Sequence, residues 1–179
     1  AIYEHESGTK IIPSSLSIKD LRKLDYSKLK EVVKKLKNAT DYVIFDSAAG
    51  LGEEALAAME LGDETIIVTN PEITAVTDAL KTSKVLEQMG KVVKGIIVNK
   101  VGRSKSEMPV KNIAEMLELP ILGVIPDDKN MQHALIRKDA LIHTHPRSKA
   151  ARAYKEVAAK IIGNHNYKTE LTLMEKLFG

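Results

Sequence analysis

Four short, mainly apolar runs place the strongest limit on how this chain can fold. They lie at 42–45, 65–68, 95–98 and 121–125. Runs without alternation of apolar and polar residues are typical of strands buried on both faces, as in a parallel sheet covered by helices. Segments with helical periodicity, at 73–89 and 107–117, separate the last three runs. The sequence therefore predicts a three-layer α/β/α fold with a mostly parallel sheet.

Two further helices and a weak strand complete the expected elements. From 27 to 37, apolar residues recur at the spacing of one helical face. The segment 148–162 has a similar face, and Gly163 follows it at the position where a left-handed residue often ends a helix. A short strand is expected at 9–12.

Composition excludes several classes of protein. The chain has 179 residues and no Cys, which excludes disulfides and thiolate metal sites and fits a reducing cytosol. Its longest apolar runs are about five residues, whereas a membrane-spanning helix needs about 20. The net charge of +3 is small and is expected to be dispersed, which does not indicate a nucleic-acid-binding protein. We therefore expect a cytoplasmic protein, with any membrane contact made peripherally at the inner face.

Polar residues stand where the expected strands end. They are Asp46, Asn70, Asn99 and Asp127. Because ligands bind at the carboxyl ends of strands in open parallel sheets, these side chains form the first candidate site. An Asp at a strand end also serves commonly as a turn or helix cap, so its position alone does not assign it a role.

The residues after the first run carry a more specific signal. Asp46-Ser47-Ala48-Ala49-Gly50 resembles the switch II motif of the MinD/ParA family of ATPases. The resemblance implies that Asp46 takes the Walker B role, contacting Mg²⁺ through water, and that Gly50 presents a backbone N–H to the γ-phosphate. Ala48 stands where the family usually has Pro, which leaves the kinetics of the switch open.

Later segments resemble the same family in the same order. The segment 68–72 resembles a strand end near the family's dimer interface and places Glu72 at the border between dimer and nucleotide. Asp78, on the next expected helix, matches a position that the family uses for partner regulation. The segment 148–153 resembles the start of the family's last core helix.

Two segments resemble the walls of the family's adenine site. Within 96–100, Asn99 matches the Asn whose carboxamide can both donate to and accept from the base. Within 123–128, Pro126 and Asp127 match the segment on the other side of adenine. The cofactors that the resemblance implies are therefore ATP or ADP together with Mg²⁺.

The chain contains no phosphate-binding loop. No stretch matches Gly-x-x-x-x-Gly-Lys-[Ser/Thr], and in the family this loop precedes the region to which this chain corresponds. Its strand would lie between the strands ending at Asp46 and Asn70, and removing it would leave backbone groups of both unpaired. Three explanations are open: the chain is a fragment, which we favour, or the two strands pair directly, or a partner chain supplies the missing strand. The chain by itself is expected to be inactive in ATP hydrolysis.

The C-terminal residues are expected to form a separate region. The C-terminal part of a P-loop ATPase domain is expected at 1–163, and a linker with a short tail at 164–179. The tail resembles the membrane-targeting tail of MinD proteins, and the alternative is a terminal helix docked on its own domain. Four apolar residues would share one side of its helix: Leu171, Met174, Leu177 and Phe178.

The resemblance implies an ATP-dependent switch of spatial organisation, as in septum placement during cell division, that acts as a homodimer with an unidentified regulatory partner. The alternatives are a DNA-partitioning relative and a non-catalytic module that has kept the fold. For the basic cluster at 147–155 we favour a solvated helix face over DNA contact. His143 and His145 are expected to be surface residues, because no third metal ligand lies near them in the sequence.

Overall fold

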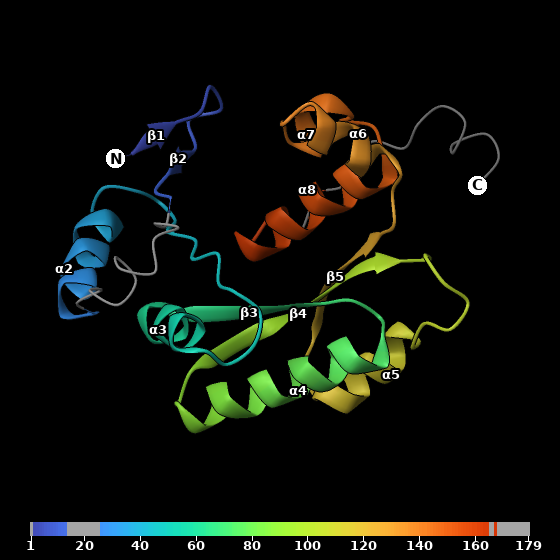
Figure 1. Ribbon diagram of the computed structural model, residues 1–179, viewed down its shortest axis with the longest axis horizontal. Helices are drawn as coiled ribbons and strands as arrows, with labels where there is room; N and C mark the ends of the chain where they lie inside the picture. The colour runs from blue at the N-terminus through green and yellow to red at the C-terminus, as the bar shows by residue number, and fades with distance from the viewer. Residues whose placement is uncertain (1, 14–25, 165–166, 168–179) are drawn as a thin grey trace. The chain divides into compact units, whose positions relative to one another are not determined.

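The computed structural model describes residues 2–13, 26–164 and 167. The chain divides into two compact units, Ala1–Asp46 and Ser47–Gly179 (Figure 1). In the described part of the chain, no helix is long and apolar enough to cross a membrane.

The described residues of the first unit form a small hairpin and one helix. Strands β1 (Tyr3–Glu4) and β2 (Lys10–Ile11) pair antiparallel, and β2 confirms part of the short strand expected there. The turn between them is closed by the His5 N–H, which donates to the Thr9 carbonyl at 2.8 Å. Helix α2 (Tyr26–Lys37) confirms the predicted helix.

The segment 42–45 is not a strand, so this part of the prediction is wrong. Residues 42–48 have no regular secondary structure, and the Ile44 side chain is 89% exposed. A strand needs a neighbour that satisfies its backbone N–H and C=O groups, and none of the described strands pairs with this segment.

The second unit is built on a parallel sheet of three strands. In spatial order they are β3 (Glu64–Thr69), β4 (Val92–Val101) and β5 (Ile121–Pro126) (Figure 1). All three apolar runs in this region are strands, and their parallel pairing confirms the predicted type of sheet.

Strand β4 is longer than the sequence predicts. It continues past Asn99 to Val101, which pairs with Pro126. Between Val98 and Val101 the register shifts by one residue, and Lys100 has a left-handed φ of 58°. The bulge explains the extension at the carboxyl end, because an apolar run cannot indicate a strand that resumes after an irregular residue. At its start β4 is also longer than predicted, since it begins at Val92.

Three helices share one core with one face of this sheet. They are α3 (Glu53–Leu61), α4 (Ile73–Gln88) and α5 (Val110–Leu117). Ile96 and Val98 of β4 are completely buried in this core. The last two helices confirm the predicted segments, although α5 begins three residues later than expected, after Pro109 at its N-cap.

The opposite face is covered by α8 (Lys149–Ile161), together with α6 (Asn130–Ile136) and α7 (Leu141–Thr144) (Figure 1). Ile125 of β5 and Val157 of α8 are buried in this second core. These layers confirm the predicted α/β/α architecture. The sequence does not indicate α6 and α7, because seven and four residues are too few to show helical periodicity.

Gly123 allows α8 to lie close to β5. A Cβ atom at this position would overlap the Val157 side chain of α8. A glycine inside a strand commonly marks such a close approach, and here it brings the two elements of the second core into contact.

Asp128 joins the starts of two helices that are far apart in the sequence. Its Oδ1 accepts a hydrogen bond from the Asn130 N–H at 2.9 Å, and its Oδ2 accepts one from the Ala150 N–H at 3.3 Å. Ser148 completes the start of α8 by accepting from the Ala151 N–H at 3.2 Å. Burial opposes the charge of Asp128, but its hydrogen-bond donors outweigh burial and lower the pKa of the carboxyl group.

Gly123→Ala is expected to lower the free energy of unfolding by about 1–3 kcal/mol, because the added methyl group must displace Val157. Urea unfolding followed by circular dichroism measures the change. Gly52→Ala is the matched control, because a Cβ there meets nothing within 4 Å. In the double variant with Val157→Ala, the cost should be smaller than the sum of the single costs. Simple additivity would contradict the overlap.

Asp128→Ala is expected to lower the free energy of unfolding by about 1–2 kcal/mol at neutral pH, since it removes caps from α6 and α8. The folded pKa lies below the ordinary value of 3.8, so this contribution is complete above 3.8 and is lost as the pH falls through the folded pKa. The gap in unfolding free energy between wild type and variant should shrink accordingly. Asp127→Ala, an exposed neighbour, should change stability by less than about 0.5 kcal/mol.

Candidate functional site

Backbone hydrogen bonds join the carboxyl ends of the three parallel strands. The Asp127 N–H, just after β5, donates to the Val101 carbonyl at the end of β4 at 2.8 Å. The Met108 N–H donates to the Pro71 carbonyl, just after β3, also at 2.8 Å. The loops after β3, β4 and β5 therefore form one continuous border, here called the carboxyl edge, where open parallel sheets bind their ligands.

Glu107 holds the loop that follows β4. Its Oε2 accepts from the Gly102 N–H at 2.8 Å, and its Oε1 accepts from the Ser104 N–H at 2.7 Å. These two hydrogen bonds are the main reason that the pKa of the Glu107 carboxyl group is lowered. No sequence pattern indicates this role, because Glu107 is expected to begin a helix and instead lies in the loop before it.

The residues expected to border adenine lie on the carboxyl edge. Asn99 is half-buried in β4, next to the bulge at Lys100. Pro126 is half-buried at the end of β5, where it pairs with Val101, and Asp127 is exposed just beyond it. The structure therefore brings the two expected walls onto neighbouring strands.

An open depression lies beside Asp127, between the end of β5 and the start of α8. Charged groups of both signs line it, so it suits a polar or charged ligand. Its residues are Asp127, Asp128, Lys129, Asn130, Arg147, Ser148, Lys149 and Arg152. The inclusion of Lys129 and Asn130 is not expected, because nothing local in the sequence signals that they meet the start of α8.

Charge is concentrated in one part of the chain, so the expectation of dispersed charge is wrong. Residues 129–164 contain eight Lys or Arg and only two Asp or Glu. The rest of the chain consequently has more acidic than basic residues, although the whole chain carries +3. The layer formed by α6, α7 and α8 is therefore strongly positive.

Glu72 and Asp78 both belong to the region of α4, the helix that follows β3. Glu72 is the N-cap of α4: its carbonyl accepts from the Val76 N–H at 3.0 Å, while its exposed side chain makes no capping hydrogen bond. Asp78 is exposed on α4 and forms an ion pair with Lys81 at 3.1 Å. Both side chains are accessible, as interface residues must be, and their roles stay predictions.

The switch II motif spans the boundary between the two units. Asp46 is exposed at the end of the first unit. Gly50 belongs to the second unit and has a φ of 91°, a left-handed conformation that Gly adopts without strain. A carboxylate such as that of Asp46 suits Mg²⁺, which is commonly held by one or two carboxylates together with substrate phosphates. The catalytic assignment of the two residues stays a prediction.

The residues of the expected membrane tail lie outside the described residues, so their role also stays a prediction. They are Leu171, Met174, Leu177 and Phe178.

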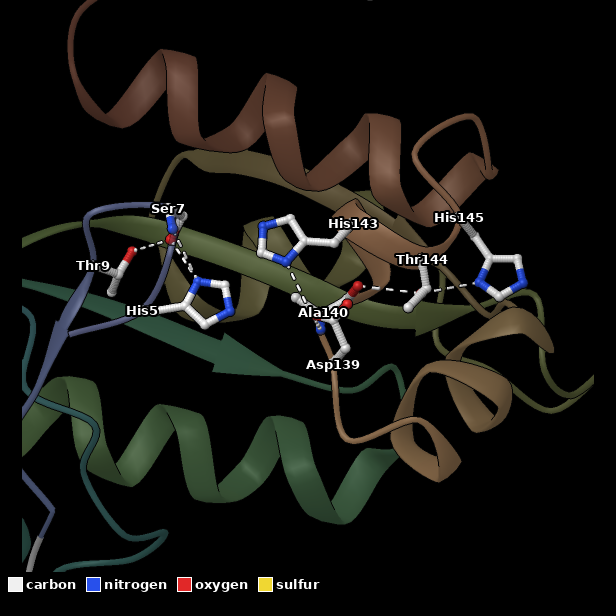
Figure 2. Close-up of polar contacts among 8 residues, drawn as sticks. All are labelled: His5, Ser7, Thr9, Asp139, Ala140, His143, Thr144 and His145. Atoms are coloured by element: carbon white, nitrogen blue, oxygen red, sulfur yellow. Dashed lines mark hydrogen bonds and ion pairs between the residues drawn. The ribbon is translucent and has the colours of Figure 1, made fainter. Parts of the chain in front are cut away.

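Local hydrogen bonds hold the two histidines of the α7 region (Figure 2). His143 Nδ1 lies 2.9 Å from Asp139 Oδ1, and His145 Nδ1 lies 3.0 Å from Thr144 Oγ1. His143 is exposed, as expected, whereas His145 is half-buried.

One known family matches most of this chain. It is described as the 4Fe-4S iron sulfur cluster binding proteins, NifH/frxC family, and it matches residues 26–177. Such clusters are held by Cys thiolates, and this chain has no Cys, so the residues present do not fit a cluster.

Two relatives of known sequence match nearly the whole chain. The uncharacterized ATP-binding protein MJ0547 of Methanocaldococcus jannaschii is 37% identical over 99% of this chain and 67% of its own length. The septum site-determining protein MinD of Neisseria meningitidis is 31% identical over 94% of this chain and 66% of its own length. The chain thus spans about two thirds of the length of these relatives.

Solved structures match the fold over nearly the whole chain. The cell division ATPase MinD of Pyrococcus furiosus is 34% identical with a TM-score of 0.83, covering 90% of this chain and 69% of that one. MinD of Pyrococcus horikoshii, solved in complex with Mg-ADP, is 33% identical with a TM-score of 0.84, covering 96% and 71%. The chain therefore belongs to the MinD/ParA-type ATPases of the NifH/frxC family.

Proposed function

We propose that the protein containing this chain is an ATP-dependent switch of the MinD type. It binds ATP, dimerises, associates reversibly with a membrane and returns to the resting state by hydrolysis. The observation that carries the proposal is the carboxyl edge, where Asn99 and Asp127 occupy neighbouring strand ends. A relative with the same fold, MinD of Pyrococcus horikoshii, has been solved with Mg-ADP.

In this proposal the carboxyl edge binds the base of the nucleotide. The Asn99 carboxamide donates to and accepts from adenine, which presents both an acceptor and an amino group. Pro126 supplies an apolar wall, and Asp127 lies beside it at the mouth of the open depression. The hydrogen bonds from the Asp127 N–H to the Val101 carbonyl and from the Gly102 N–H to Glu107 support the arrangement, because they fix the loops that follow β5 and β4.

In this proposal the residues of switch II contact the phosphates of the nucleotide and the Mg²⁺ ion. Asp46 would hold Mg²⁺ through water, and the ion would neutralise charge on the phosphates. The Gly50 N–H would face the γ-phosphate, since the absence of a side chain leaves the backbone accessible. The sequence contains no Gly-x-x-x-x-Gly-Lys-[Ser/Thr] loop, so the chain alone is proposed not to hydrolyse ATP.

The remaining residues are assigned to assembly. Glu72 would border the dimer interface and the nucleotide, and Asp78 would contact a regulatory partner from the exposed side of α4. The tail at 171–179 would contact the membrane. Such a short amphipathic segment binds weakly alone, so dimerisation would strengthen attachment by presenting two tails.

A DNA-partitioning activity is the second candidate, favoured by the basic residues around the open depression. Lys129, Arg147 and Lys149 line it together with Arg152. Retention on DNA that weakens steeply with salt, and that is lost in Arg147→Gln and Lys149→Gln, would support this candidate over membrane association. The third alternative is a non-catalytic module, which stable and monodisperse folding of these 179 residues without nucleotide would support.

Isothermal titration of the complete protein with Mg·ATP should give saturable binding, and light scattering should show a dimer in ATP and a monomer in ADP. The reason is that the γ-phosphate must be present to bridge two subunits through their switch regions. Absence of both binding and dimerisation would contradict the proposed function.

Asn99→Ala in the complete protein is expected to weaken ATP binding about tenfold, because a hydrogen-bonding partner of the base is removed from a half-buried position. The preference for ATP over GTP should fall by a similar factor. Competition with a fluorescent nucleotide measures both. Asn112→Ala on the exposed side of α5 is the matched control. If both substitutions changed ATP affinity equally, the assignment of Asn99 to adenine would be contradicted.

A further inference from the structure

Helix α6 ends in a tight turn that exposes four consecutive side chains. The Lys138 N–H donates to the Leu135 carbonyl at 3.0 Å, and the Asp139 N–H donates to the Ala134 carbonyl at 3.2 Å. This pair of hydrogen bonds is the Schellman motif, in which the residue after the helix adopts a left-handed conformation. The four residues 135–138, here called the α6 corner, are all exposed.

Two of these side chains are aliphatic and protrude into solvent. Leu135 is 68% exposed and Ile136 is 79% exposed, while Ala134 just before them is buried against the second core. Arg137 and Lys138 follow directly. The corner therefore combines a protruding apolar pair with two adjacent positive charges.

The connection that follows is held in place, so the apolar pair cannot easily turn inward. Asp139 Oδ1 accepts from the Ala140 N–H at 2.6 Å and lies 2.9 Å from His143 Nδ1 (Figure 2). Thr144 Oγ1 donates to the Ala140 carbonyl at 3.2 Å. Leu141 is buried in the second core. The corner is thus fixed at both ends by buried residues, Ala134 and Leu141.

Lys138 is in a backbone conformation that disfavours it. Its φ is 53°, in the left-handed region where Gly is the usual residue at the end of a Schellman motif. A bulky residue there costs stability, and an observed outlier of this kind is a reason to look for a function of the side chain. A lysine at this position adds a second positive charge to the corner, two residues after the exposed Ile136.

We propose that the α6 corner contacts an anionic lipid surface, with Leu135 and Ile136 entering the interface and Arg137 and Lys138 meeting lipid headgroups. The proposal rests on the membrane association included in the proposed function, but it assigns the contact to a different element from the tail. Charge complementarity supports this occupant, because residues 129–164 have a surplus of six basic over acidic residues. Apolar side chains flanked by Lys and Arg are the composition of peripheral membrane contacts.

A nucleic acid fits the corner less well. Phosphate contacts would use Arg137 and Lys138 but would leave Leu135 and Ile136 in water, and no residue of the corner is an aromatic on which a base could stack. A lipid surface accounts for both the apolar pair and the charges. A second anchoring element also agrees with the weakness of a single short amphipathic segment.

The test is sedimentation of the 179-residue chain with vesicles made of equal parts phosphatidylcholine and phosphatidylglycerol, compared with phosphatidylcholine alone. The informative variant is Lys138→Gly, which removes the charge and also the cost of the left-handed conformation, because Gly adopts it without strain. It should bind anionic vesicles about fivefold more weakly, while its unfolding midpoint stays equal or rises. A loss of binding through unfolding is thereby excluded.

Ile136→Ser should weaken binding about tenfold, because the entering apolar side chain is lost. Lys111→Gln is the matched control, since it removes one positive charge from α5 on the opposite layer and should leave binding nearly unchanged. A chain ending at residue 170, which lacks the expected tail, should bind more weakly overall but show the same fold-changes for the corner variants.

Wild-type binding to anionic vesicles that is unaffected by Lys138→Gly and Ile136→Ser would overturn the inference and leave attachment to the tail alone. Corner variants that keep vesicle binding but lose retention on DNA would overturn it in favour of a nucleic acid. Failure of the wild-type chain to bind anionic vesicles would overturn both the corner and the membrane part of the proposed function. ATP binding by the complete protein is measured separately and would not be affected by that result.

Discussion

The pairing of β4 with a strand on each side is the constraint on which the second unit depends. Strand β4 is the central strand, and its residues Ile96 and Val98 are completely buried. At its carboxyl end, the Val101 carbonyl accepts a hydrogen bond from the Asp127 N–H. The same backbone pairing that holds the sheet together therefore places Asn99 and Asp127 on adjacent strand ends, where a ligand can contact both.

The parts of this fold that the sequence predicts are those set by local periodicity. The runs at 65–68, 95–98 and 121–125 are strands, and each of them pairs with a neighbour in the parallel sheet. The run at 42–45 has the same composition but is irregular, because a strand also depends on a neighbour that a local pattern cannot reveal. The composition of a run indicates how readily its side chains are buried. Whether the run forms a strand also depends on a second strand with which its backbone can pair.

Some features of the candidate site can likewise be predicted from the sequence, and others cannot. Asn99, Pro126 and Asp127 follow apolar runs, so their position at the carboxyl edge can be read from the order of the chain. The contact of Asp128 with the Ala150 N–H joins residues 22 positions apart, and no short motif signals it. The positive character of 129–164 could have been counted in the sequence, but a single net charge for the whole chain conceals it.

Asp128 has a consequence that reaches beyond the stability of two helix starts. One carboxylate meets the first residues of both α6 and α8, directly after the proposed base-binding Asp127. Helix α6 is only seven residues long, so its far end, the α6 corner, is within about two turns of that carboxylate. Were Asp128 to shift on nucleotide binding, the start of α6 that it caps would shift with it, which would couple the nucleotide to the corner. Thermodynamic linkage makes such coupling reciprocal: a lipid surface that prefers the nucleotide-bound arrangement must tighten nucleotide binding by the same factor.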